Sequence, residues 1–480
     1  MSAQRLSWRD PSGFVVRDGQ RILRAVVPDS VPNAKRLLAC DWLQSHIAAG
    51  RIPASHWVDY ESTGLPNGAE LHWIEHERLL FPAYPHEISA LQLHDAAKLT
   101  LLLALDALDH GWVLKDASAW NVLFDHGRPV FCDLLSFEPY VPSATWMAYA
   151  QFQRCFTIPL LLYRTARIAP RTWFVLDREG LSPESARKLL PARTAWIQPG
   201  LEAVTLPALL SKRGQRQRAA GGSGESATGN ASRSKHVLRA TLRRLARHVD
   251  ALKPATPKSP WIEYQSSRQH YEDEDLRQKA SFVRDALTDP AIRSVLDLGC
   301  NTGEYSVLAA ELGKRVVAVD GDDASIQRLY ERQQATPSDI SPMVLNIARP
   351  PPALGWLNTE IPSFMARAAA GFDCVMALGL IHHLAITERA PMAMIVDLLQ
   401  RLTRHSLIVE WVEREDPRFR QLAGPNWPLY QSLTRQSFEL LLSGCFRLRS
   451  SLTLPCGTRT LSHWQLSSIP QRDTTALAPG

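Results

Sequence analysis

One stretch of the chain, residues 294–306, decides the fold of the C-terminal half and reads SVLDLGCNTGEYS. Its first residues, Ser294 to Leu298, form a short apolar run that predicts a buried strand. The turn that follows contains Gly299 and Gly303, and a helical pattern begins directly after it. A strand, a glycine-containing turn and a helix N-terminus together point backbone N–H groups at a ligand. We therefore predict a cradle for a nucleoside cofactor.

From residue 294 onward, short apolar segments alternate with segments of helical periodicity. Such alternation predicts an α/β fold with a mostly parallel, doubly wound sheet. The expected strands are residues 294–299, 315–320, 342–347, 372–379 and 406–412, and the expected helices are residues 302–313, 324–334 and 392–402. A helix near 435–442, followed by strands at 446–448 and 461–466, predicts an antiparallel hairpin at one edge of the sheet.

A carboxylate follows the glycine turn at an informative distance. Asp320 ends the second strand, about 20 residues after the turn, where an acid can accept both hydroxyls of a ribose. The turn itself reads D-x-G-x-x-x-G, starting at Asp297. A dinucleotide site would instead need G-x-G-x-x-G to admit a pyrophosphate. These features favour a single nucleoside over a dinucleotide.

The pattern resembles motif I of the class I S-adenosylmethionine-dependent methyltransferases, over residues 261–466. The family usually has three alternating glycines after the acid; Asn301 replaces the middle one, and Asn tolerates left-handed backbone conformations better than most residues. The resemblance implies a Rossmann-like domain that binds S-adenosyl-L-methionine through this loop, Asn301 included. It implies these further contacts: Asp297, Gly299 and Gly303 at the methionine end, Asp320 at the ribose, Gly321 and Asp322 at the adjacent rim, and Asn346 at the adenine amine.

Three polar residues follow the fourth and fifth strands, at the edge where open α/β sheets bind ligands. His382 and His383 resemble the histidine signature that the family has after its fourth strand. Either histidine could act as a general base on a substrate hydroxyl, or could merely pack on the cofactor. Glu410, at the end of the fifth strand, could orient the acceptor or share the role of base. These three residues are the candidate catalytic groups.

The N-terminal half, residues 1–210, contains a second constellation in an expected α+β domain. Asp116, Asn121 and Asp133 have the spacing of the catalytic loop and metal-binding strand of protein-kinase-like folds, which they resemble. No glycine-rich phosphate loop lies near the start, and Arg24 stands where a kinase has a lysine. We therefore expect a degenerate kinase-like domain without phosphoryl transfer, and we predict no metal site.

The whole arrangement resembles bacterial methyltransferases related to nodulation protein NoeA. The resemblance is carried by LKDASAWNVLF, CDLLSFEPY and MAYAQFQRCFTIPLLLY in the first half, and by DLGCNTGEYS in the second. We divide the chain into the kinase-like domain at 1–210, a flexible basic linker at 211–235, a basic amphipathic helix at 236–260, the methyltransferase domain at 261–470 and a disordered tail at 471–480. The helix could contact an acidic surface or dock on its own domain.

Composition and charge limit the possible partners. The 480 residues are 45% hydrophobic and 21% charged, as in folded globular proteins, with a net charge of +6. Between residues 211 and 260, twelve Lys and Arg residues are balanced only by Glu225 and Asp250, so the rest of the chain is slightly acidic. This distribution favours a small-molecule substrate over nucleic acid.

The location of the protein is also suggested by the sequence. No apolar stretch is long enough for a membrane span, and the first residues lack the apolar core of a signal peptide. The seven cysteines form no C-x-x-C pair, which argues against a disulfide framework or a zinc site. We expect a cytoplasmic protein.

The sequence therefore predicts S-adenosylmethionine-dependent methylation of an unidentified acceptor, with a small hydroxylated metabolite or carbohydrate favoured. Two alternatives stay open. One is a phosphotransferase that uses the N-terminal half with ATP and magnesium, and the other is a cofactor-binding protein without catalysis. Nothing in the sequence indicates the oligomeric state.

Overall fold

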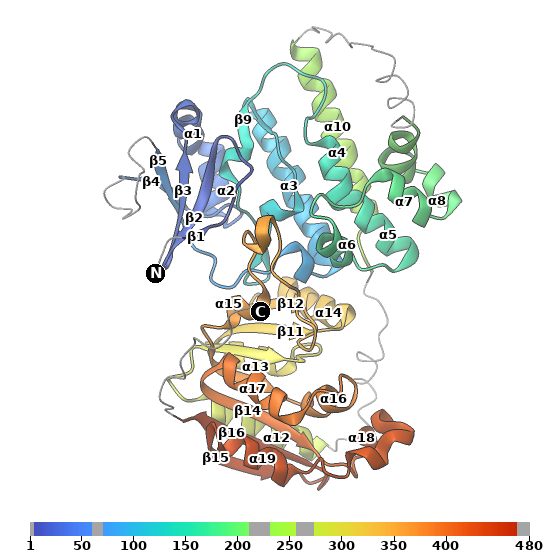
Figure 1. The fold of residues 1–480 in the computed structure, drawn as a ribbon. Helices are drawn as coiled ribbons and strands as arrows, with labels where there is room; N and C mark the ends of the chain where they lie inside the picture. The colour runs from blue at the N-terminus through green and yellow to red at the C-terminus, as the bar shows by residue number, and fades with distance from the viewer. Residues whose placement is uncertain (1–3, 60–70, 211–230, 256–272, 468–480) are drawn as a thin grey trace. The chain divides into compact units, whose positions relative to one another are not determined.

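The computed structural model describes residues 4–59, 71–210, 231–255 and 273–467. The chain forms two units. Figure 1 shows the fold, with the colour running from blue at the N-terminus to red at the C-terminus. Unit 1 comprises Met1–Pro257 together with Pro351–Ser363, and unit 2 comprises Lys258–Pro350 together with Phe364–Gly480. The predicted tail at 471–480 and most of the predicted linker, 211–230, lie outside the described residues.

Unit 2 is built on a seven-stranded sheet with the strand order β12-β11-β10-β13-β14-β16-β15. The first five strands in this order are parallel, and β16 pairs antiparallel with both β14 and β15. The predicted α/β sheet with an antiparallel edge hairpin is thereby confirmed. The strands are β10 (Ser294–Leu298), β11 (Arg315–Asp320), β12 (Ile340–Val344), β13 (Phe372–Ala377), β14 (Thr403–Val412), β15 (Phe446–Thr453) and β16 (Arg459–Leu466).

Helices cover the sheet because its central strands are apolar on both faces. Val295 of β10 pairs in register with Val316 of β11, and both are fully buried. Continuous apolar strands of this kind need cover on each side, which the connecting helices provide (Figure 1). The helices of unit 2 are α12 (Asp273–Leu287), α13 (Glu304–Glu311), α14 (Asp323–Ala335), α15 (Phe364–Ala368), α16 (Ile381–Ile386), α17 (Met392–Leu402), α18 (Pro417–Ala423) and α19 (Arg435–Ser443).

Unit 1 begins with a five-stranded antiparallel sheet in the order β1-β2-β3-β5-β4. Its strands are β1 (Gln4–Arg5), β2 (Gly13–Asp18), β3 (Arg21–Val26), β4 (Ser55–Val58) and β5 (His72–His76), with α1 (Val31–Leu38) and α2 (Asp41–Ala48) between β3 and β4. β2 and β3 form an antiparallel hairpin that turns at Gly19 and Gln20. The α+β character expected of this half is present.

The rest of unit 1 is mainly helical and contains two two-stranded antiparallel sheets. One pairs β6 (Trp112–Leu114) with β9 (Phe137–Pro139), and the other is the hairpin of β7 (Val122–Asp125) and β8 (Arg128–Phe131). The helices are α3 (Ala90–Asp109), α4 (Tyr149–Phe152), α5 (Ile158–Ala166), α6 (Arg171–Leu176), α7 (Pro183–Leu189), α8 (Ala192–Trp196) and α10 (Ala231–Ala251).

The basic helix α10 docks on its own unit. It starts and ends earlier than the predicted 236–260, and it buries Leu238, Leu242 and Leu245. Arg239 forms an ion pair with Asp109 at the end of α3. Of the two roles considered for this helix, packing within its own domain is therefore the one observed.

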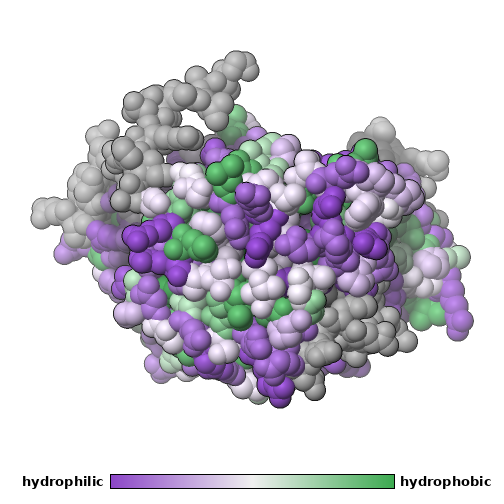
Figure 2. Space-filling model, turned by 90° about the horizontal axis from the view of Figure 1, so that it is seen from below, coloured by the Kyte–Doolittle hydropathy of each residue, from purple (hydrophilic) through white to green (hydrophobic). Residues whose placement is uncertain are grey.

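The outer surface is mixed in polarity. Figure 2 shows hydrophobic side chains in small groups between hydrophilic ones on the face in view. Within the described ranges, no helix combines the length and the apolar character needed to cross a bilayer.

Candidate functional site

The glycine turn at residues 299–303 joins β10 to α13. Gly299, Asn301 and Gly303 have φ angles of 69°, 52° and 79°. These values lie in the left-handed region, which glycine and asparagine adopt at lower cost than other residues. The asparagine at the middle position is therefore compatible with the conformation of the turn.

Gly303 precedes α13 and packs against a neighbouring helix. A Cβ atom on it would lie 2.4 Å from Cδ1 of Leu329 on α14. Gly303 is not on the wall of the cavity described below. The predicted contact of Gly303 with the methionine end of a cofactor stays a prediction, beside the packing contact that the structure shows.

Asp320 ends β11 and holds the glycine turn. Its Oδ2 accepts a hydrogen bond from the backbone N–H of Asn301 at 2.9 Å, and its Oδ1 accepts one from the N–H of Asp322 at 2.8 Å. Burial raises the pKa of Asp320, although these two hydrogen bonds oppose the shift. The carboxylate is therefore fixed in place by two adjacent loops.

Asp297 is the second-last residue of β10 and is almost fully buried. The hydroxyl of Ser306, on α13, donates a 2.6 Å hydrogen bond to its Oδ2. Burial raises the pKa of Asp297 to about 6, with the nearby charge of Asp320 adding to the shift and the Ser306 hydrogen bond opposing it. A cation bound nearby would favour the ionised form of this carboxyl.

Residues distant in the sequence meet at one cavity of unit 2, with a volume of about 860 Å³. Because the parallel strands all end at the same sheet edge, the loops that follow them converge there. The predicted site residues on its wall are Asp297, Gly299, Asn301, Asp320, Gly321, Asn346, His382, His383 and Glu410. We call the part formed by the first six the cofactor half, and the part formed by His382, His383 and Glu410 the acceptor half.

Asn346 follows β12 and is already engaged on both ends of its amide. Its Oδ1 accepts a hydrogen bond from the N–H of Ala348 at 2.9 Å, and its Nδ2 donates to Glu388 at 3.3 Å. A carbonyl oxygen has two lone pairs, so Oδ1 keeps the capacity for one more hydrogen bond. Gly321 lies close by, since its Cβ position would be 3.7 Å from Cβ of Asn346.

His382 and His383 open α16 and have ring centroids 4.2 Å apart. His382 is 6% exposed, and its Nδ1 has no hydrogen-bond partner among the residues that the structure describes. Burial, followed by the charges of His383 and Arg459, lowers the pKa of His382 well below its usual value. Burial and the Arg459 charge lower the pKa of His383 to about 4. Both imidazoles are therefore neutral at physiological pH.

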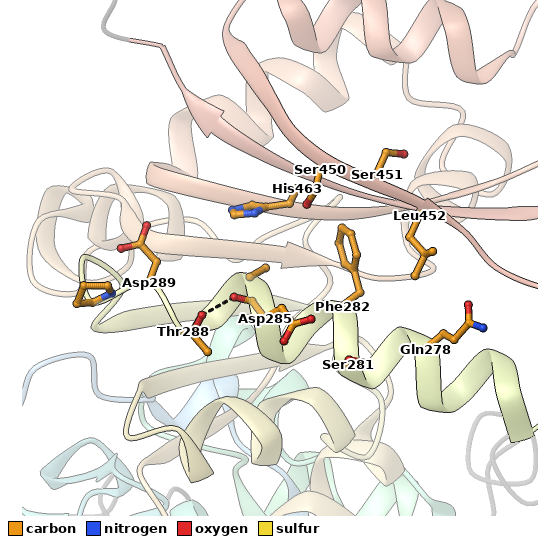
Figure 3. Close-up of a pocket in the computed structure, with 12 residues that line it drawn as sticks. Gln278, Ser281, Phe282, Asp285, Thr288, Asp289, Ser450, Ser451, Leu452 and His463 are labelled. Carbon is orange, nitrogen blue, oxygen red and sulfur yellow. Dashed lines mark hydrogen bonds between the residues drawn. The ribbon is translucent and has the colours of Figure 1, made fainter.

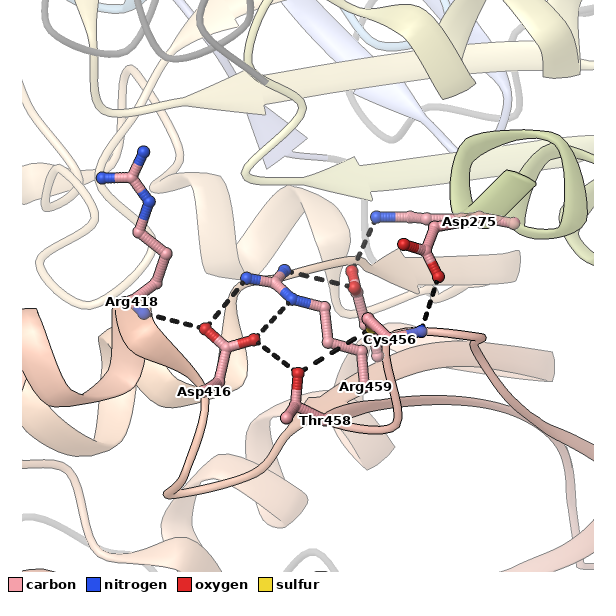
Figure 4. Close-up of polar contacts among 8 residues, drawn as sticks. Asp275, Asp416, Arg418, Cys456, Thr458 and Arg459 are labelled. Atoms are coloured by element: carbon pink, nitrogen blue, oxygen red, sulfur yellow. Dashed lines mark hydrogen bonds and ion pairs between the residues drawn. The ribbon is translucent and has the colours of Figure 1, made fainter. Parts of the chain in front are cut away.

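Glu410 lies within β14, two residues before its end, and is completely buried. It belongs to a row of four alternating charges that we call the charge quartet: Lys279, Glu410, Arg459 and Asp416. The distances are 2.6 Å from Lys279 Nζ to Glu410 Oε2, 3.4 Å from Arg459 Nη1 to Glu410 Oε1, and 2.9 Å from Arg459 Nε to Asp416 Oδ2. Figure 4 shows the guanidinium of Arg459 directed at Asp416, beside Thr458.

The sequence analysis missed three members of the quartet. Lys279 comes from α12, Arg459 from the start of β16, and Asp416 from the N-cap of α18. None of them lies in a recognisable motif.

A second hollow of unit 2, of about 750 Å³, contains none of the predicted residues (Figure 3). It lies between α12 and the β15-β16 hairpin, with Phe282 and Leu452 on its wall. Asp289 at its edge is occupied by a 3.0 Å contact with Nε2 of His405. His463 is likewise bonded to the hydroxyl of Ser406, at 2.6 Å.

In unit 1, the kinase-like constellation is closed by hydrogen bonds and an ion pair. Ser136 Oγ donates to Asp133 and accepts from Nδ2 of Asn121 at 3.5 Å. Arg24 from β3 contacts Asp133 at 2.9 Å. Asp116 accepts the N–H of Ser118, and burial raises its pKa. Among the described residues, no group of three or more His, Cys, Asp or Glu side chains is placed to hold a metal ion.

Comparison with known proteins shows the family. A family model described as a methyltransferase domain matches residues 264–432. Nodulation protein NoeA of Rhizobium meliloti (strain 1021) is 30% identical over 464 residues, which cover 96% of this chain and 95% of that protein.

Solved structures show weaker similarity. N-methyltransferase NodS from Bradyrhizobium japonicum WM9 is 14% identical, with 41% of this chain and 98% of that chain covered and a TM-score of 0.31. The bifunctional kinase-methyltransferase WbdD is 20% identical, with 41% and 40% covered and a TM-score of 0.29. Both TM-scores lie far below 0.5, so the assignment rests on the family model and the NoeA relative.

The family-model match lies mostly in the unit that contains the cavity, and the NoeA match covers 96% of the chain and so extends over both units. The prediction of a methyltransferase with S-adenosylmethionine as its cofactor is confirmed. The chain belongs to the family of nodulation protein NoeA, and its C-terminal unit contains a methyltransferase domain.

Proposed function

We propose that unit 2 transfers a methyl group from S-adenosylmethionine to a small hydroxylated metabolite or carbohydrate. The observation that supports this best is the single cavity in which the glycine turn, braced by Asp320, faces His382 and Glu410. The cofactor supplies an electrophilic methyl group. The protein supplies position, because aligning two reactants in one site removes much of the entropic cost of their encounter.

The cofactor half fits this group. Asp320 lies on the cavity wall, held by the backbone N–H groups of Asn301 and Asp322, and its remaining lone pairs can accept hydrogen bonds from ribose hydroxyls. The turn is closely packed at Gly299, where a Cβ atom would lie 3.2 Å from Cδ1 of Leu380, so a residue without a side chain keeps this part of the cavity wall open. Asp297 provides negative charge beside the turn, and Asn346 retains one lone pair for an adenine amine.

The acceptor half holds the substrate in this proposal. His382, His383 and Glu410 would contact the acceptor and fix its nucleophilic atom toward the cofactor half. Glu410 is suited to orienting a substrate because Lys279 and Arg459 hold its carboxylate on two sides. His382 lies on the cavity wall, and its Nδ1 atom has no hydrogen-bond partner among the residues that the structure describes.

Calorimetry separates this proposal from its alternatives. We expect S-adenosylmethionine and its demethylated product to bind, and ATP with magnesium not to bind. Binding of ATP alone would favour the phosphotransferase. Binding of S-adenosylmethionine without any transfer of labelled methyl groups to a small-molecule cell extract would favour a cofactor-binding protein without catalysis.

For unit 1 we propose a degenerate kinase-like domain over residues 1–210 that does not transfer phosphoryl groups. The guanidinium of Arg24 supports this, because it contacts the carboxylate of Asp133 that a kinase would use for magnesium. Asn121 and Asp133 are joined through Ser136 instead of facing an open site. The domain division at 211–235, 236–260 and 261–470 is part of the same proposal.

We further propose that nucleic acid is not the substrate. The basic residues of α10 are partly used inside unit 1, where Arg244 contacts Glu202 at 3.0 Å. Nucleic-acid binding that persists after deletion of residues 212–258 would contradict this. A cytoplasmic location stays a prediction, which fractionation of cells that express the protein would test.

A further inference from the structure

A fifth charged side chain, Arg418, lies on the wall of the cavity beside the charge quartet. It is carried by α18, which packs against α16 through the buried side chains of Phe419 and Ile386. Since α16 also carries His382, Arg418 belongs to the acceptor half of the cavity. Arg418 is half-buried, whereas the four members of the quartet are at most 6% exposed. Of these five charges, that of Arg418 is the most accessible to a ligand.

The charge quartet is neutralised by its own contacts. Glu410 is bonded to Lys279 at one oxygen, at 2.6 Å, and to Arg459 at the other, at 3.4 Å. Asp416 accepts hydrogen bonds from Nε and Nη2 of Arg459 at 2.9 and 3.3 Å, and one from the hydroxyl of Thr458 at 3.0 Å. Charges buried this deeply need such local compensation. Neither carboxylate can therefore turn to another cation without leaving its own partner uncompensated.

The guanidinium of Arg418 lies outside these contacts. Oδ1 of Asp416 accepts a hydrogen bond from the backbone N–H of Arg418 at 2.8 Å, while the guanidinium is directed away from that carboxylate (Figure 4). Nη1 of Arg418 donates to Oε1 of Gln421 at 2.9 Å. Because the side chain of Gln421 is an uncharged amide, this hydrogen bond does not neutralise the arginine.

The charges on the cavity wall are divided unevenly between its two halves. Among the residues that the structure describes, the acceptor half has three cations and one carboxylate on the wall: Lys279, Arg418, Arg459 and Glu410. Asp416, which is not on the wall, adds a second carboxylate, so one positive charge is in surplus. The other charged groups of the described wall are all carboxylates: Asp297, Glu304, Asp320, Asp322 and Glu388.

Two further carboxylates precede α18 without offsetting this surplus. Glu413 contacts Arg435 at 3.9 Å, and Glu415 contacts Arg414 at 3.5 Å. None of these four residues is on the wall of the cavity. The cavity therefore has an acidic side, which suits the sulfonium cation of the cofactor, and a side with a positive surplus at Arg418.

A ligand that fills the acceptor half removes water from around the guanidinium of Arg418. Withdrawing a charge from water is costly unless an opposite charge takes the place of the water. A carboxylate or a phosphate on the ligand would supply that charge, and a guanidinium can bind two of its oxygens at once. A neutral ligand would leave the arginine uncompensated, and a cationic ligand would add repulsion.

We propose that the methyl acceptor carries an anionic group, either a carboxylate or a phosphate monoester, and that Arg418 binds this group. The inference rests on the proposed function. It narrows the small hydroxylated metabolites and carbohydrates named there to the acidic ones. Arg418 is then a residue that determines specificity, because it selects the acceptor by charge.

The first test separates possible acceptors by charge before the reaction. A small-molecule extract of the cells that naturally contain the protein is passed over a quaternary-ammonium resin at about pH 7, where carboxylates and phosphates are ionised. The retained and unretained fractions are then incubated with the protein and methyl-labelled S-adenosylmethionine. We expect at least about tenfold more label in the retained fraction, the factor that corresponds to about 1.4 kcal/mol of preference.

Two treatments of the retained fraction distinguish the sources of the charge. Alkaline phosphatase removes phosphate monoesters, and a carbodiimide with methylamine converts carboxylates into neutral amides. We expect one of the two treatments to abolish transfer of label, and the effective one identifies the anionic group. Transfer that survives both treatments would overturn the inference.

Variants of Arg418 test whether its charge selects the acceptor. In Arg418→Gln, the concentration of the retained fraction that gives half-maximal transfer should rise at least about tenfold, with S-adenosylmethionine affinity unchanged. Arg418→Lys should lose less, because it keeps the charge without the planar fork, and Arg418→Glu should lose more. Arg420→Gln is the matched control, since Arg420 is exposed on the same helix, contacts the ring of Trp427 and is not on the cavity wall.

The remaining outcomes overturn the inference. They are transfer mainly to the unretained fraction, equal transfer to both fractions, unchanged transfer by folded Arg418→Gln, or equal losses in the Lys, Gln and Glu variants, which would show a packing role only. If the protein does not bind S-adenosylmethionine, or transfers label to neither fraction, the proposed function fails and the inference falls with it. Transfer to uncharged acceptors alone would refute the inference and leave the proposed function standing.

Discussion

Replacing Asp320 by Ala is expected to weaken S-adenosylmethionine binding by about 100-fold or more. A hydrogen bond to a charged group contributes about 1.5 to 3 kcal/mol. Two such bonds to ribose hydroxyls therefore contribute at least about 3 kcal/mol, which corresponds to a factor of about 100 in affinity. Asp320 is placed to form both, because its carboxylate lies on the cavity wall and is held there by the N–H groups of Asn301 and Asp322.

The structure adds a second contribution to this loss. The Ala variant frees the N–H groups of Asn301 and Asp322, which brace the glycine turn on one side and the start of α14 on the other. Asp320→Asn should lose less, because its amide keeps one oxygen acceptor and the shape of the side chain. We expect the Asn variant to lie between the wild-type protein and the Ala variant.

Isothermal titration calorimetry measures this directly, with the fold checked by circular dichroism. Asp339→Asn is a matched control, since Asp339 precedes β12, is not on the wall of the cavity and forms a 4.0 Å ion pair with Arg315. It should bind as the wild-type protein does. A folded Asp320→Ala variant with unchanged affinity would remove Asp320 from the ribose site and refute the reasoning.

Three further predictions test other parts of the structure. Burial raises the pKa of Asp297 to about 6, so its negative charge is lost as the pH falls through that value. Calorimetry between about pH 5 and 7.5 should therefore show weaker S-adenosylmethionine binding at the acid end, and a smaller change for the demethylated product, whose sulfur is uncharged. An affinity that does not change with pH would contradict this. Gly303→Ala should lower the free energy of unfolding, measured in urea titrations, by about 2 to 4 kcal/mol, because alanine is strained at a left-handed φ and its Cβ overpacks against Leu329. Gly313→Ala is the control, since Gly313 has a similar φ but open space around it, and it should lose only about 1 to 2 kcal/mol. Equal losses in the two variants would refute the packing role of Gly303. Asp133→Ala should lower the melting temperature, because it leaves the buried Arg24 without its 2.9 Å partner, at a cost of about 3 kcal/mol. If the wild-type protein instead hydrolyses ATP with magnesium and this variant does not, unit 1 transfers phosphoryl groups and the prediction is wrong.

Local patterns account for the parts of the fold around the cavity that the sequence predicts. The strand at 294–298, the turn after it and the acid at Asp320 are short-range features, and each has one dominant physical cause: apolar burial, left-handed backbone or the end of a parallel strand. Parallel topology then brings strand ends to one edge, which explains why His382 and Glu410 reach the same cavity. The motif alone does not tell a glycine that faces a ligand from one that admits a neighbouring helix, and the packing of Leu329 against Gly303 is seen only in the structure.

The amino-acid sequence by itself determined the α/β fold of the C-terminal half, the glycine turn and its carboxylate, since these depend on residues within one β-α unit. Only the tertiary structure decided the chemistry of the acceptor half. Lys279 and Glu410 are 131 residues apart, and Arg459 and Glu410 are 49 apart, yet all three are buried in contact. The charge state of a buried group depends on what surrounds it in space. For that reason the neutral histidines, the balanced quartet and the pairing of Arg24 with Asp133 follow from the packing of distant segments and from no local pattern.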